Sequence, residues 1–163
     1  MHHFIFPTQD TWISSGSKTI TGESFRDQNF GRDQILEVKK EFFNLSFDHQ
    51  TRALVNFSGT DFTEMSQSIV KKDIHNPRFF LRLYEAEGNA EFSDTQYTLH
   101  ALPISESWVE GLGKFSDNPK NINGCSWENT SNIRGGTPTA WTTTGGSVLS
   151  VSSSAQSFTT VSP

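Results

Sequence analysis

Residues 107–131 hold two of the four tryptophans of the chain among glycines, asparagines and one proline. An exposed indole ring is a flat apolar surface on which a sugar ring can stack, and amide or carboxylate groups beside it can bind the sugar hydroxyls. The residues that would form such a glycan platform are Trp108, Glu110, Asn121, Trp127 and Asn129. The favoured alternative is that both rings seal the core and that glycine and asparagine supply the backbone conformations of a long loop.

Acidic and amide side chains near the first predicted turn form a second candidate site. Asp10, Asn29 and Asp33 carry the oxygen atoms that calcium prefers as ligands. The spacing is not that of an EF-hand loop, and the same residue types are typical of Asx turns, in which the side chain accepts a bond from the backbone. Both interpretations stay open, and the turns are favoured over the metal.

The sequence contains no arrangement of residues that is typical of catalysis. His49, His75 and His100 are isolated, and neither a G-x-S-x-G nor an H-E-x-x-H pattern occurs. The single cysteine, Cys125, allows neither an intrachain disulfide nor a zinc site built from thiolates. We therefore expect a protein that is not an enzyme and that has no cofactor, with calcium as the one candidate.

Composition argues against two classes of partner. The formal net charge is −5, and lysine and arginine are scattered along the chain, so the basic patch expected of a nucleic-acid-binding protein is missing. The first residues do not resemble a signal peptide, and no apolar run approaches the roughly 20 residues that cross a bilayer. We expect no nucleic acid and no membrane as partner, and synthesis in the cytosol.

Short segments rich in aromatic and β-branched residues recur between turn sequences, as in proteins built from many β-strands. The expected strands are residues 4–6, 11–14, 34–38, 52–57, 78–84 and 97–102. This pattern favours an all-β fold, an antiparallel β-sandwich or jelly roll, formed by residues 1–134. Residues 107–131 would then lie as a long loop over one end of the sandwich.

One helix is expected in residues 60–72. Asp61 is its predicted N-cap, and Glu64 three residues later would complete a capping box. Phe62, Met65 and Ile69 share one face, which we expect to cover one end of the sandwich. A stripe that binds a partner would have the same pattern.

Residues 135–163 contain no charged side chain and are dominated by serine and threonine. We expect them to form a tail outside the sandwich domain, either a linker or an extended strand. Nothing in such a segment blocks pairing with a strand of another chain. The tail and the open sheet edge together suggest a homo-oligomer.

Several motifs occur in a fixed order along the chain: D-T-W-I at residues 10–13, N-F-G at 29–31, R-A-L-V-N-F at 52–57, L-R-L-Y at 81–84, W-V-E-G at 108–111 and G-C-S-W-E-N at 124–129. This series resembles the DNRLRE-type domain, a β-sandwich found as a carbohydrate-binding module on secreted enzymes, on bacterial surface proteins and in virion proteins of tailed phages. The resemblance covers about residues 8–130. The family pattern normally continues with a D-V-T segment, a further tryptophan and an N-Y-G strand, whereas this chain ends in S-F-T-T-V-S-P.

The resemblance implies two functions. The first is a structural subunit of a tailed-bacteriophage virion of a cyanophage-like type, a decoration or appendage protein on capsid, neck or tail. Such a subunit would assemble with other virion proteins in the host cytoplasm, which agrees with the expected lack of a signal peptide and of disulfides. The alternative is a carbohydrate-binding module, free or part of a larger enzyme or adsorption protein, that binds a surface glycan.

Overall fold

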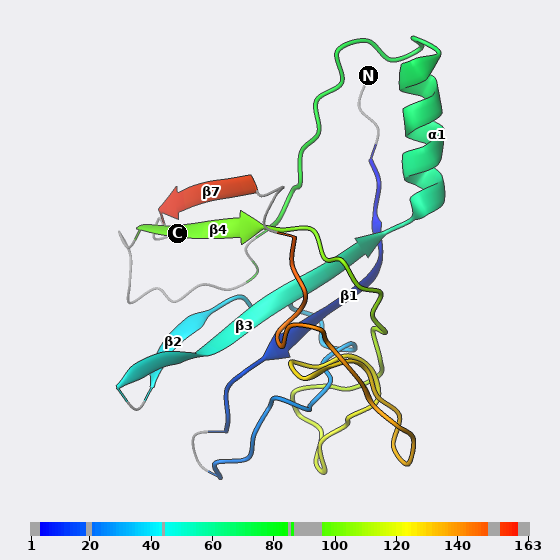
Figure 1. Cartoon of the computed structure of the whole chain (residues 1–163). Coiled ribbons are helices and arrows are strands. Elements are labelled where there is room, and N and C mark those ends of the chain that lie inside the picture. Colours follow the sequence, from blue (N-terminus) through cyan, green and yellow to red (C-terminus); the bar gives the residue numbers. More distant parts are fainter. Residues whose placement is uncertain are drawn as a thin grey trace.

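The computed structural model describes residues 4–18, 21–43, 45–84, 86, 96–149 and 154–159, and these are mostly strands with one short helix (Figure 1). The elements are β1 (Pro7–Ser14), β2 (Lys40–Phe43), β3 (Ser46–Phe57), α1 (Gly59–Val70), β4 (Gln96–Ala101), β5 (Asn129–Ser131), β6 (Thr139–Ala140) and β7 (Ser154–Thr159). They form small antiparallel sheets in the orders β1-β3-β2, β4-β7 and β5-β6. The architecture is compatible with the predicted all-β class.

The pairing of β1 with β3 organises the core. Its register runs from Pro7 opposite Phe57 to Ser14 opposite Thr51, with an irregularity between Pro7 and Gln9. Residues 11–14 are buried. Because neighbouring residues of a strand point to opposite faces, β1 contributes to two separate clusters of buried side chains.

Each cluster starts from one residue of β1. Trp12 packs with Phe25 and Phe30, and Leu36 packs against this group. The second cluster consists of Ile13, Leu54, Cys125, Trp127 and Trp141, and Ile104 and Trp108 pack against it. Both faces of β1 are therefore covered, and residues 107–131, which we call the Trp loop, supply part of the cover beside β1 (Figure 1).

Part of the predicted tail lies in the folded body. Trp141 is only 5% exposed, and β6 pairs with β5 next to it. Further on, β7 pairs with β4 of the same chain, from Ser154 opposite Ala101 to Thr159 opposite Gln96. The strand that we expected in the tail therefore has a partner within its own chain.

The strand predictions succeeded only where a neighbouring strand exists. The structure confirms strands in residues 11–14 and 52–57, and β4 covers most of residues 97–102. Residues 4–6, 34–38 and 78–84 were predicted as strands and are not strands in the structure. A high β-propensity is realised only when another strand completes the ladder.

The helix begins earlier than predicted and covers no sheet. Its N-cap is Ser58, whose hydroxyl accepts a bond from the backbone N–H of Asp61 at 3.5 Å, so the predicted Asp61 cap is wrong. Asp61 lies instead in the first turn, where its charge complements the helix dipole. No residue of α1 is buried, so the helix does not act as the core cover that we expected (Figure 1).

Candidate functional site

Asn29 joins the turn after β1 to the Trp loop. Its fully buried Nδ2 donates to the carbonyl oxygens of Glu110 at 2.7 Å and Cys125 at 2.8 Å. Its Oδ1 accepts from the backbone N–H groups of Gly31 at 3.2 Å and Gly113 at 2.8 Å. Both donors and both lone pairs of the amide are thus used inside the protein. The bond to Gly31 is an Asx turn.

Glycines make room for this amide. A Cβ atom on Gly111 would lie 2.4 Å from the Asn29 Oδ1, and one on Gly124 would lie 2.5 Å from the Asn29 Nδ2. A Cβ atom on Gly113 would lie 2.2 Å from the Asn29 carbonyl oxygen. Such distances exclude any side chain, so these positions require glycine. The motifs N-F-G, W-V-E-G and G-C-S-W thus meet at Asn29.

Asp33 holds the first aromatic cluster. Its Oδ2 accepts from the Trp12 Nε1 at 3.0 Å, and both of its oxygens lie 3.1 Å from the backbone nitrogen of Phe115. The Trp12 ring stacks on Phe30 with ring centroids 3.8 Å apart. Asp33 therefore fixes the Trp12 indole and the turn of the Trp loop at Phe115 at the same time.

The predicted calcium ligands do not fit a calcium ion. The Asn29 oxygen and both Asp33 oxygens face N–H groups, whose positive ends would repel a cation. Asp10 meets the same region through its backbone N–H, which donates to the Glu110 Oε1 at 3.3 Å. In the part of the chain that the structure describes, no group of three or more His, Cys, Asp or Glu could hold a metal.

Trp127 is enclosed by its surroundings and only 8% exposed. The Arg52 guanidinium lies over the ring, 4.9 Å from its centroid, and the Arg52 Nη1 donates to the carbonyl of Gly145 at 2.6 Å. A Cβ atom on Gly145 would come within 2.7 Å of the ring. Burial lowers the pKa of Arg52 from its ordinary value. The Trp127 ring thus has little surface left for a sugar, whereas Trp108 is only half-buried.

The other predicted glycan-binding residues, Glu110, Asn121 and Asn129, each make a different contact within the protein. Glu110 is half-buried and bonded to the backbone of β1, and Asn129 is buried within β5. The Asn121 Oδ1 accepts from the backbone N–H of Asn123 at 2.9 Å. Of the predicted set, only Asn121 lines the polar hollow described next.

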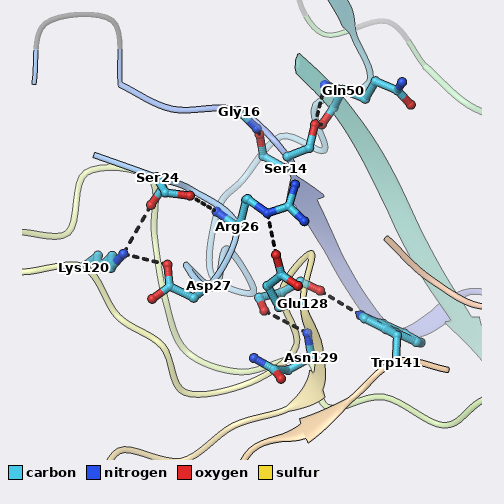
Figure 2. Close-up of polar contacts among 12 residues, drawn as sticks. Ser14, Gly16, Ser24, Arg26, Asp27, Gln50, Lys120, Glu128, Asn129 and Trp141 are labelled. Carbon is cyan, nitrogen blue, oxygen red and sulfur yellow. Dashed lines mark hydrogen bonds and ion pairs between the residues drawn. The ribbon is translucent and has the colours of Figure 1, made fainter. Parts of the chain in front are cut away.

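A polar hollow of about 280 Å³ lies at the tip of the Trp loop. It is lined by Asp117, Asn118, Pro119, Lys120, Asn121, Asn123 and Arg134. The Lys120 Nζ reaches the Asp27 Oδ1 at 2.6 Å, and Figure 2 shows this pair beside the ion pair of Arg26 with Glu128. The hollow offers amide, carboxylate and guanidinium groups without an aromatic ring.

Residues 4–6 and 58–84, which we call the apolar arm, form an exposed surface. Figure 1 shows α1 and the segment that follows it at one end of the molecule, opposite the Trp loop. The exposed apolar side chains are Phe4, Phe6, Phe62, Val70, Ile74, Phe79, Phe80, Leu81, Leu83 and Tyr84, each between 37% and 86% exposed. A hollow of about 400 Å³ runs along α1 between Phe62 and Val70. Of the helices in the described residues, none is long and apolar enough to span a bilayer.

Sequence reasoning identified these surfaces only in part. It expected Phe62 to cover the end of the sandwich and residues 78–84 to form a strand, and it kept a partner-binding stripe on the helix as the alternative. The arginines at 78 and 82 were a sign that the second segment reaches solvent. For the hollow, the sequence pointed to Asn121 but gave no sign that Arg134, 13 positions further on, would join it.

Comparison with protein-family models, with curated proteins and with solved structures finds no match to this chain.

Proposed function

We propose that the chain is a non-enzymatic structural subunit of a tailed-bacteriophage virion, a decoration or appendage protein of the capsid, neck or tail. The observation that carries this proposal is the apolar arm. Its aromatic and aliphatic side chains are exposed over α1 and residues 71–84. Exposed apolar side chains that gather in a patch mark a surface that another protein covers.

We further propose a β-sandwich of the DNRLRE type for the folded body. Three of the segments that carry the resemblance, N-F-G at 29–31, W-V-E-G at 108–111 and G-C-S-W-E-N at 124–129, pack together around Asn29, as motifs of one domain would. The burial of Trp12 and Ile13 on opposite faces of β1 also suits a strand that is covered on both sides. These contacts support the proposal through packing alone.

The virion role is tested on particles. An antibody raised against the purified chain should label particles of the phage that encodes it at one defined position in electron microscopy. Antibody absorbed beforehand with the purified chain is the control. Mass spectrometry of particles purified by density gradient should detect peptides of the chain at a fixed ratio to the major capsid protein. Particles that lack the chain in both measurements would refute the role.

Glycan binding is the second candidate function, and the polar hollow is the observation that favours it. Asn121, Asn123 and Arg134 offer the amide and guanidinium groups that bind sugar hydroxyls. Calorimetric titration with host-surface polysaccharide should show binding that Asn121→Ala and Arg134→Ala weaken and that Asn56→Ala, an exposed control, leaves unchanged. Equal affinity in all of these variants would exclude the hollow as the binding site.

A further inference from the structure

The apolar arm is large enough to form one side of a stable protein interface. Six of its side chains are aromatic, Phe4, Phe6, Phe62, Phe79, Phe80 and Tyr84, and they are between 42% and 86% exposed. Complete burial of one aromatic side chain removes about 150–250 Å² from water, so covering the exposed parts of these six removes about 800 Å². A standard interface takes about 800 Å² from each partner.

The charges of the arm are divided along the chain. Within α1, Asp61 and Glu64 are acidic and no residue is basic. The next 14 residues, 71–84, carry four basic side chains, Lys71, Lys72, Arg78 and Arg82, against the single acidic Asp73. Within the residues that the structure describes, none of these side chains takes part in an ion pair. The arm therefore has an acidic half, α1, and a basic half, residues 71–84.

Such a division makes the arm complementary to itself. In a two-fold dimer the same patch meets its copy, so every contact of residue i with residue j occurs twice. An antiparallel pair places the acidic helix of each copy against the basic segment of the other, while the rings meet in the middle. Because β7 is already paired with β4, the Ser/Thr-rich strand is not needed for this contact.

We propose that the apolar arm binds a second copy of this chain in a two-fold dimer, with α1 of each copy against residues 71–84 of the other. The inference rests on the proposed structural role, for which it names the first assembly step. The interface would remove from water the side chains that the isolated chain exposes.

Sedimentation velocity of the full chain over a range of concentrations gives the first test. We expect a dimer that dissociates on dilution. Phe80→Ser combined with Tyr84→Ser should yield a monomer, and Ile133→Ser, which alters an equally exposed apolar residue outside the arm, should leave the dimer intact. Near-ultraviolet circular dichroism establishes that each variant keeps the native core. A wild-type chain that is monomeric, or that forms only undefined aggregates, would overturn the inference.

Charge exchange tests the arrangement itself. A variant with a basic arm, Asp61→Asn with Glu64→Lys, should dimerise at least about tenfold more weakly, because like charges then face each other. A variant with an acidic arm, Lys71→Glu with Arg78→Glu, should show the same loss. An equimolar mixture of the two should form a mixed dimer, because opposite charges again meet across the axis. Failure of the mixture to associate more tightly than either variant would overturn the proposed pairing.

The outcomes separate the dimer from the virion role. A chain that is monomeric in solution but present on particles would overturn the dimer and leave the structural role in place. A dimer with the expected charge exchange, made by a chain that particles lack, would support the interface and refute the virion role.

Discussion

Replacing Asn29 by alanine should remove a large part of the stability of the protein. The side chain makes four hydrogen bonds, two as donor and two as acceptor, and its loss leaves two carbonyls and two N–H groups without their partner. Each group that stays unsatisfied costs about 1–3 kcal/mol. The lower value applies here because two of the four bonds are only partly buried, which gives a total of about 4 kcal/mol. Domains of this kind are stable by about 5–15 kcal/mol.

Urea unfolding followed by tryptophan fluorescence measures this loss. With a slope of about 2 kcal/mol per molar urea, the midpoint for Asn29→Ala should fall by about 2 M. Asn29→Asp should lose a similar amount, because it places a carboxylate oxygen against the two carbonyl oxygens that the amide now binds. The matched control is Asn56→Ala, which removes one exposed bond to Gln9 and should cost less than about 0.5 kcal/mol. A loss below about 1 kcal/mol for Asn29→Ala would refute the role assigned to the amide.

Three further predictions concern the second core cluster and the helix. Trp127→Ala should lower the free energy of unfolding in urea by about 3–5 kcal/mol, as for a buried ring, and an unchanged midpoint would contradict this placement. Burial raises the pKa of the Cys125 thiol to about 12, so a disulfide reagent at pH 8 should modify it only after unfolding in urea; rapid reaction of the native chain would show an accessible thiol. Ser58→Ala should reduce the helical circular dichroism signal and lower the free energy of unfolding by about 1 kcal/mol. Ser66→Ala, which removes no cap, should change neither quantity.

The sequence predicted those strands whose partners are also strongly patterned. Residues 11–14 and 52–57 combine β-branched or aromatic residues with alternation, and they pair with each other in β1 and β3. Residues 78–84 have an equally strong local pattern but no partner strand among the described residues. Local propensity contains no information on whether a neighbouring strand exists, and this is why the two segments differ.

The roles of single residues were harder to predict. Asn29 was identified as part of a turn, but its bonds to Glu110 and Cys125 join positions 81 and 96 residues apart, which no local pattern reveals. Trp141 was assigned to a tail because its surroundings are uncharged and rich in serine and threonine. The indole itself was the better signal, since a large ring is more often buried than its neighbours suggest.

The separation of Asn29 from its partners also has a consequence for synthesis. A ribosome that adds about 5–20 residues per second needs roughly 5–20 s to proceed from the first turn to the Trp loop. Throughout this interval Trp12 and Phe30 have been made, but Phe115, whose ring later lies beside theirs, has not. The yield of folded chain should therefore depend on chaperones that hold the first half. It should rise when the supply of such chaperones is increased.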